Sequence, residues 1–100
     1  MTKKQAIIIG GGHNGLVAAN YLAQAGVQVL VLERRDMVGG ACITEELFPG
    51  YRVSSCSYIS HLLQDKVVDD LELRKHGLKM HLIDPYRFQP FPNGRAMLTW

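Results

Sequence analysis

The pattern of apolar and polar positions divides the first third of the chain into four elements. Residues 5–9 form a short apolar run rich in β-branched isoleucine, and residues 27–32 form a second apolar run. Both runs predict buried strands. An alanine-rich helical pattern lies between them from about residue 14 to residue 25, and Gly26 follows where a helix end favours a left-handed residue. A strand, a turn, a helix and a strand in this order predict a βαβ unit with two parallel strands.

The pattern is looser after residue 33. Residues 34–40 are predicted to form a loop, and residues 44–47 a helical turn that Pro49-Gly50 stops. Residues 51–58 have a mixed pattern that permits an extended segment. No long regular element is predicted in this stretch.

Helical spacing returns in the second half of the chain. Residues 65–76 have an apolar side and a basic last turn, and they predict a helix with Gly77 at the left-handed position after it. Residues 78–83 alternate between apolar and polar as a strand does. Two runs within residues 86–100 flank Asn93-Gly94, a dipeptide typical of tight hairpin turns. This half is therefore predicted to hold a helix, a strand and a β-hairpin.

The composition is that of a globular protein. Of the 100 residues, 47% are hydrophobic and 20% are charged, which excludes a disordered or fibrous chain. The net charge of +2 comes from scattered residues, so we expect no nucleic-acid partner. No apolar run reaches the ~20 residues of a membrane-spanning helix, and the basic start at Lys3-Lys4 leads to no secretory cleavage pattern. We therefore expect a cytoplasmic protein whose association with membranes, if any, depends on regions outside this chain.

The turn after the first strand has the spacing of a dinucleotide-binding loop. Gly10, Gly12 and Gly15 satisfy G-x-G-x-x-G, and Glu33 follows the second strand, 18 residues after Gly15. Gly10 permits the tight turn, Gly12 lets the backbone approach a pyrophosphate, and Gly15 lets the helix pack closely on the strand. Glu33 can accept hydrogen bonds from ribose hydroxyls and repels a 2′-phosphate, which disfavours NADP. The alternative is a structural glycine turn with a solvated glutamate.

Residues beside this pattern have more than one interpretation. N–H groups at the helix N-terminus can hold phosphates at the positive end of the helix dipole. The His13 side chain either donates to a phosphate oxygen or points to solvent while its backbone binds. Arg34 is a candidate to cover an adenine or to reach a phosphate. His61, His76 and His81 lack the spacing of metal ligands, so no metal site is predicted.

A second glycine motif narrows the choice of dinucleotide. Glu33-Arg34-Arg35 followed by Gly39-Gly40-Ala41 resembles the second sequence block of flavoproteins with two dinucleotide-binding domains. The resemblance implies that the glutamate binds the ribose of FAD. It also implies that the glycine pair brings backbone close to the FAD diphosphate and ribityl chain. FAD is therefore favoured over NAD.

The cysteines separate two branches of these flavoproteins. Pyridine nucleotide–disulfide reductases carry a C-x4-C dithiol after the glycine pair. Cys42 lies at the first position of this motif, but the second position is Leu47, and Cys56 is too distant to replace it. We therefore expect Cys42 and Cys56 to be small packed residues with free thiols. The stretches at residues 39–53 and 70–78 resemble instead the phytoene desaturase and flavin amine oxidase superfamily, in particular its phytoene-dehydrogenase-related proteins.

That resemblance implies removal of a hydride from a C–H bond by the flavin, with reoxidation by an acceptor that the sequence does not identify. The expected substrate is a small molecule, apolar or an amine. Two alternatives stay open: a non-catalytic nucleotide-binding module and an NAD-dependent dehydrogenase. The residues expected to bind the cofactor are Gly10, Gly11, Gly12, His13, Asn14, Gly15, Glu33, Arg34, Gly39, Gly40 and Ala41.

The expected fold is an incomplete α/β domain. A Rossmann-like βαβ unit that binds FAD is followed by a helix and a β-hairpin, but a Rossmann sheet also needs a third parallel strand and helices on both faces. We therefore interpret residues 1–100 as the N-terminal part of an FAD/NAD(P)-binding Rossmann-like domain, with catalytic residues beyond them. Alone, this piece is expected to be inactive and to expose apolar side chains of its two strands, namely Ile7, Ile9, Val29 and Val31.

Overall fold

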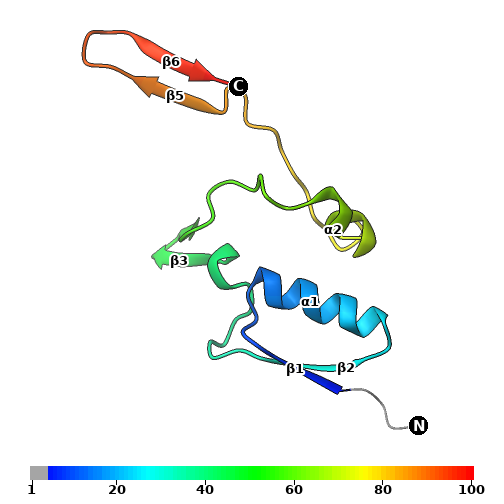
Figure 1. Ribbon diagram of the computed structural model, residues 1–100. Helices are drawn as coiled ribbons and strands as arrows, with labels where there is room; N and C mark the ends of the chain where they lie inside the picture. The colour runs from blue at the N-terminus through cyan, green and yellow to red at the C-terminus, as the bar shows by residue number, and fades with distance from the viewer. Residues whose placement is uncertain (1–4) are drawn as a thin grey trace.

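A computed structural model describes residues 5–100 and confirms the βαβ unit. Strand β1 (Gln5–Ile9), helix α1 (His13–Gln24) and strand β2 (Gln28–Leu32) follow in order. The two strands pair in parallel, with Gln5 opposite Gln28 and Ile9 opposite Leu32. Figure 1 shows α1 lying along one side of this two-stranded ribbon. The predicted ends of these elements are correct to within one residue.

One face of the ribbon is covered and the other is open. The alternation of side chains turns Ile8, Val29 and Val31 toward the helix-covered face, where they are half-buried. The exposed face carries Ile7, Ile9, Leu30 and Leu32, and Ile9 is 87% exposed. The expectation that Val29 and Val31 are exposed is therefore wrong. In parallel register Ile7 lies opposite Leu30, so the residues of β2 on its face are the leucines.

A β-hairpin replaces the predicted helical turn over residues 44–47. Strand β3 (Thr44–Phe48) pairs antiparallel with β4 (Tyr51–Ser54). Pro49-Gly50 forms the connection, with a φ of 81° at Gly50, whose N–H donates to Glu46 Oε1 at 2.8 Å. Two adjacent glutamates favour a helix locally, but cross-strand pairing with a β-favouring partner prevails.

The second predicted helix is shorter than expected. Helix α2 spans Asp65–Asp70, and the chain then continues in turns as far as Gly77, which has the predicted left-handed conformation with a φ of 97°. The predicted strand over residues 78–83 is absent from the described structure. Leu82 is fully exposed, and no neighbouring strand pairs with this segment. The last hairpin is confirmed as β5 (Arg87–Pro90) paired with β6 (Ala96–Thr99).

The buried core is small and lies between α1, the turn before β3 and α2. Its side chains are those of Ala19, Ile43, Val68 and Leu71, each at most 9% exposed. The Tyr21 hydroxyl donates to Asp70 Oδ2 at 2.7 Å and joins the two helices. This core holds the glycine turn and the turn before β3 on the same side of the molecule.

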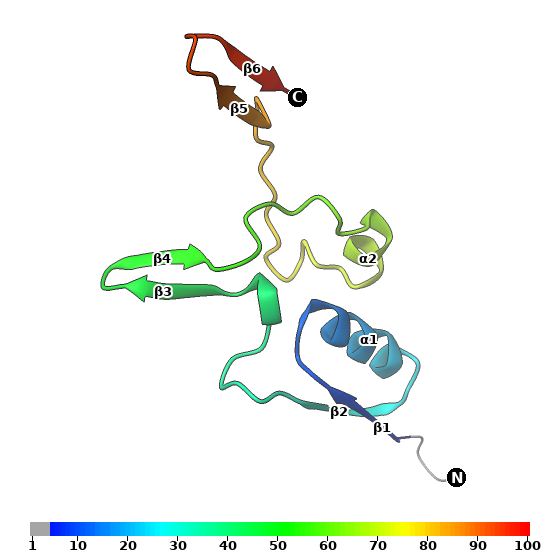
Figure 2. The ribbon, with the colours of Figure 1, turned by 60° about the vertical axis from the view of Figure 1, so that its left-hand side comes forward.

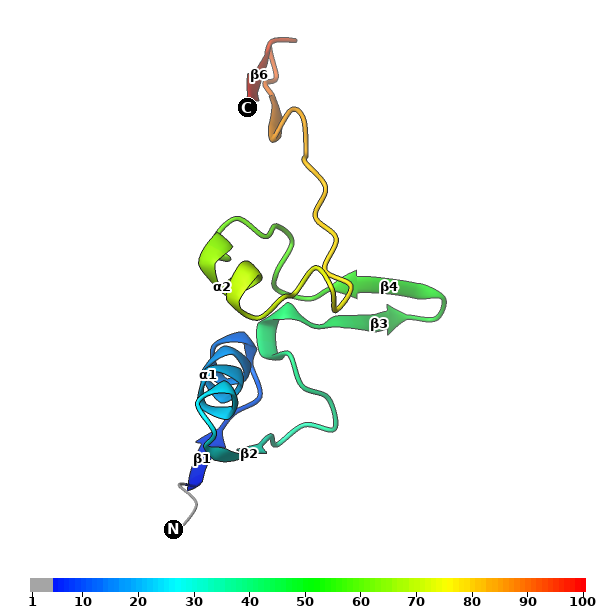
Figure 3. The same cartoon turned by 90° about the vertical axis from the view of Figure 1, so that its right-hand side faces the viewer.

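The rest of the chain extends away from this core. The β3–β4 hairpin projects sideways, and the β5–β6 hairpin lies at the end of an extended segment (Figures 2 and 3). The Cα radius of gyration is 18.5 Å, compared with about 13 Å for a compact 100-residue domain. Among residues 5–100, no helix has the length and apolar character needed to cross a bilayer.

Candidate dinucleotide-binding site

The two predicted glycine motifs lie side by side. The Gly10 N–H donates to Leu32 O at 2.7 Å and ties the start of the turn to the end of β2. The Gly39 N–H donates to Gly11 O, also at 2.7 Å, and Gly12 and Gly39 form a parallel bridge. Residues from both motifs therefore form one surface of partly exposed backbone at the carboxyl ends of the strands, where ligands bind in α/β sheets.

Close packing around the glycine turn requires Gly15 and Gly40, and Gly39 packs against Ile43, whose Cγ2 would lie 2.7 Å from an added Cβ. A Cβ on Gly15 would lie 2.2 Å from the carbonyl oxygen of Gly10, so no side chain fits between helix and turn. A Cβ on Gly40 would lie 3.0 Å from the Cα of Gly12, and Gly40 also has a φ of 58°. Gly15 and Gly40 thus allow the turn, the helix and the glycine pair to approach one another.

Gly12 is different, because nothing among residues 5–100 requires a glycine there. Its φ of −73° and ψ of 173° are accessible to any residue. The nearest atom to a Cβ at this position would be the Cα of Gly40, at an ordinary contact distance of 3.9 Å. The absence of a side chain at Gly12 therefore leaves open space beside the glycine pair. A pyrophosphate that approaches the backbone would use this space.

Helix α1 begins beside that space with N–H groups for which the described part of the chain supplies no partner. Gly12 is the N-cap residue and supplies no side-chain hydrogen bond, and the first turn contains no acidic residue. The first helical bond runs from the Leu16 N–H to Gly12 O at 2.9 Å, so the preceding helical N–H groups have no intrahelical acceptor. The side chains of His13 and Asn14 are exposed. This end of α1 is electrostatically suited to an anion.

Glu33 lies against the glycine turn. Its Oε2 accepts the Gly11 N–H at 2.7 Å, and its Oε1 accepts the Arg35 N–H at 2.9 Å. The bond from Arg35, followed by that from Gly11, lowers the pKa of Glu33 below its ordinary value, because both stabilise the carboxylate. A carboxylate has about four acceptor positions, so lone pairs are left for ribose hydroxyls. Sequence reasoning missed the bond to Gly11, which joins residues far apart in the chain.

The remaining predicted residues lie around this surface. Arg34 is exposed, and its charge is a further, smaller cause of the lowered pKa of Glu33. Ala41 is exposed within the 3-10 turn η1 (Gly40–Cys42). Cys42 and Cys56 are both free and exposed, so the prediction that they are packed is wrong, although their thiols are free as expected.

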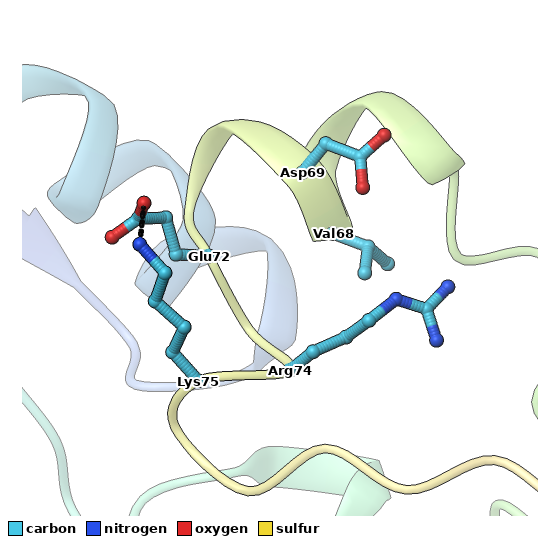
Figure 4. A pocket seen from close by; sticks show the side chains of 5 residues that line it. All are labelled: Val68, Asp69, Glu72, Arg74 and Lys75. Carbon is cyan, nitrogen blue, oxygen red and sulfur yellow. Dashed lines mark hydrogen bonds and ion pairs between the residues drawn. The ribbon is translucent and has the colours of Figure 1, made fainter.

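The hollows found among residues 5–100 do not coincide with the glycine surface. A hollow of about 210 Å³ lies instead on α2 and the turn after it (Figure 4). There Lys75 forms an ion pair with Glu72 across the turn. None of the predicted cofactor-binding residues lines this hollow. The residues of the two glycine motifs therefore lie outside this hollow. The hollow is lined by Val68, Asp69, Glu72, Arg74 and Lys75.

Comparison with known families agrees with this geometry. The family model for the NAD(P)-binding Rossmann-like domain matches residues 8–72, which include both glycine motifs and Glu33. The chain belongs to this family. The Rossmann-like fold predicted from the sequence is thereby confirmed, and such domains are typical of oxidoreductases that use FAD or NAD(P).

Curated relatives of this Rossmann-like domain are considerably longer than the chain. The mouse protein named pyridine nucleotide-disulfide oxidoreductase domain-containing protein 2 is 56% identical over 85 residues, which are 85% of this chain and 15% of that protein. A limonene dehydrogenase polypeptide of Castellaniella defragrans is 59% identical over 72 residues, 71% of this chain and 13% of the relative. Phytoene desaturase of Neurospora crassa is 47% identical over 49 residues, 49% of this chain and 8% of the relative.

These relatives confirm the resemblance to the phytoene desaturase group stated from the sequence. The chain spans about 15% of the length of the first two relatives, the mouse and rat proteins of the same name. No solved structure matches the chain at a significant level. Sequence comparison thus establishes that the chain belongs to the Rossmann-like family and is similar to these relatives. The boundaries of the domain within a longer protein stay a prediction.

Proposed function

We propose that this Rossmann-like domain binds FAD and forms the adenosine and pyrophosphate end of the cofactor site in a flavin-dependent oxidoreductase. The observation that carries the proposal is the open space at Gly12 beside the backbone of Gly39 and Gly40. A glycine that neither conformation nor packing requires is explained by a ligand that approaches the backbone. A structural glycine turn would give no reason for this position.

Each part of the surface has a role in this proposal. The unpaired N–H groups at the start of α1 hold the pyrophosphate, and His13 and Asn14 contribute their backbone there. Glu33 accepts hydrogen bonds from the adenosine ribose and keeps out a 2′-phosphate by charge repulsion. Gly39 and Gly40 follow the diphosphate with partly exposed backbone, and Arg34 lies next to the ribose site. Ala41 continues this surface into η1.

The resemblance to flavoproteins favours FAD over NAD, and the names of two relatives favour a redox role. The glycine pair is held directly against the phosphate turn by the Gly39–Gly11 hydrogen bond, as the resemblance to flavoproteins implies. A desaturase and a dehydrogenase are among the relatives, and both names denote removal of hydrogen from a substrate. When bound, FAD would accept the two electrons and the hydrogen that leave the substrate. The residues described here hold and orient the cofactor.

The class of substrate is part of the same proposal. Two relatives are named after hydrocarbons, phytoene and limonene. This favours the apolar member of the two substrate classes expected from the sequence, an apolar molecule rather than an amine. The cytoplasmic location stays a prediction.

The test is a size change at Gly12 in the intact protein. Gly12→Val puts a side chain into the open space, while Ala18→Val adds bulk at an exposed position of the same helix. We expect Gly12→Val to keep its circular dichroism spectrum and to bind FAD about tenfold or more weakly than the parent, a difference of about 1.4 kcal/mol or more. Ala18→Val is expected to bind FAD like the parent.

Flavin absorbance of the purified proteins and fluorescence titration of the flavin-free forms give the readout. Full flavin retention by Gly12→Val would mean that the turn does not hold the pyrophosphate. A parent protein that binds NAD and no flavin would support the NAD-dependent dehydrogenase instead. Binding of FAD without turnover by any electron acceptor would support a non-catalytic nucleotide-binding module.

A further inference from the structure

An ion pair closes the loop that carries the glycine pair. The Arg35 guanidinium, after β2, pairs with Glu45 Oε1 on β3. The other oxygen of this carboxylate, Oε2, accepts the Ser55 hydroxyl at 3.1 Å. Residues 36–44, with Gly39 and Gly40 among them, therefore form a loop whose two ends are joined through charged side chains. The same bonds attach the β3–β4 hairpin to this loop.

Arg35 is also connected to the glycine turn. Its backbone N–H donates to Glu33 Oε1 at 2.9 Å, and Glu33 Oε2 accepts the Gly11 N–H at 2.7 Å. The middle of the loop also contacts Gly11, because the Gly39 N–H donates to Gly11 O at 2.7 Å. The loop is thus attached to the glycine turn at its start and at its centre, and the ion pair fixes its far end.

We propose that Arg35 and Glu45 form a clasp that positions Gly39 and Gly40 against the glycine turn and thereby raises the affinity for the dinucleotide. This inference rests on the proposed function. Both residues act through the loop, so they are positioning residues. Joining the ends of a short loop lowers the number of conformations it can adopt, which favours the one seen here. Because the guanidinium of Arg35 pairs with Glu45, Arg34 is the one of these two adjacent arginines that is available to the cofactor.

The expected effects are modest, since the pair is partly exposed, 46% at the Arg35 side chain and 27% at that of Glu45. Such pairs contribute little to global stability. The clasp should therefore alter the local order of the loop and the affinity more than the unfolding temperature. A residue that served only global stability would show the reverse.

The experiment uses Arg35→Gln, Glu45→Gln and the double variant in the intact protein. Arg52→Gln is the control, because Arg52 is an exposed arginine on the same hairpin for which no ion pair is found in the described part of the chain. Hydrogen exchange of the peptide covering residues 36–44 is measured without nucleotide, and FAD is then titrated. We expect faster exchange and about two- to fivefold weaker FAD binding in each single variant. The double variant should be no worse than either single one.

Unchanged exchange in both single variants, or effects that add in the double variant, would overturn the clasp. Equal effects in Arg52→Gln would also overturn it. If the parent binds no FAD, the proposed function fails, but exchange in the nucleotide-free protein still decides whether the clasp exists. Circular dichroism spectra equal to that of the parent establish that each variant is folded.

Discussion

The two halves of the molecule are held together in different ways. In residues 5–43, backbone contacts backbone: two strands pair in parallel, a helix crosses between them, and two glycine motifs bond to each other. In residues 44–100, two hairpins each pair within themselves, and a long extended segment separates the second hairpin from the helices (Figure 3). The first half therefore brings the residues of the proposed binding site together on one surface.

This difference affects how each half responds to substitution. Where main-chain atoms approach closely, a single added carbon has no room, and the substitution lowers the stability of the whole βαβ unit. Where side chains are exposed, as at Leu82, Tyr58 and Trp100, a substitution changes little inside the chain. Such apolar side chains are instead suited to contact with other parts of a longer protein or a partner. Paired substitutions, one in each half, test this comparison.

The largest effect is expected for Gly15→Ala. Alanine is about 1 kcal/mol better than glycine inside a helix, but here its Cβ would lie 2.2 Å from the carbonyl oxygen of Gly10, whose N–H is bonded to Leu32 O. We expect a net destabilisation of about 3 kcal/mol, measured by urea unfolding of the intact protein. Gly94→Ala, with a φ of 78° and no atom nearby, should cost about 1 kcal/mol. Equal losses would contradict the comparison.

A smaller effect is expected in the core between the helices. Val68 is 2% exposed, and Val68→Ala removes two buried methyl groups and leaves a cavity, at a cost of about 2 kcal/mol. Val53 on β4 is 42% exposed, so Val53→Ala should cost about 0.5 kcal/mol. Thermal unfolding of both variants provides the comparison. A larger loss at Val53 would mean that the hairpin is buried against something in the intact protein.

The same contrast explains what the sequence could predict. The βαβ unit depends on local signals: isoleucine-rich runs, an alanine-rich helix and glycines at fixed spacing, and these were sufficient for its elements and for both glycine motifs. The helical turn predicted at residues 44–47 failed because its two glutamates favour a helix, whereas the pairing with Tyr51–Ser54 across Pro49-Gly50 is not visible in that window.

The other differences arise from a missing partner strand, from a wide turn after α2 and from one long-range bond. Residues 78–83 alternate like a strand but have no partner strand in the described structure. Helix α2 ends at Asp70, and the Leu73 N–H then bonds to Val68 O in a wider turn. The second role of Glu33, as an acceptor for the Gly11 N–H, depends on the fold that brings the two residues together. The sequence indicates Glu33 as a ribose ligand and is silent about this bond.

A titration is expected at the contact between the helices. The hydrogen bond to Asp70 raises the pKa of Tyr21 above its ordinary value of 10.0. The protonated tyrosine is favoured in the folded protein, so its stabilising effect is complete below pH 10.0 and is lost as the pH rises through the higher folded pKa. Asp70→Ala should return the pKa of Tyr21 toward 10.0, as followed by NMR of the tyrosine ring. Asp69→Ala, at the neighbouring exposed position, is the control and should leave it raised.

The smallest expected effect concerns the glycine turn itself. The N–H groups of Arg35 and then Gly11 lower the pKa of Glu33 below 4.5. The stabilisation they give is therefore present above pH 4.5 and is lost as the pH falls through the lower folded pKa. NMR of carboxyl-labelled glutamate should show one resonance with a midpoint below 4.5, and Glu33→Gln should remove that resonance. In the same pH range the Gly11 and Arg35 amide signals should shift. A midpoint at or above 4.5 would mean that these bonds do not hold the carboxylate in solution.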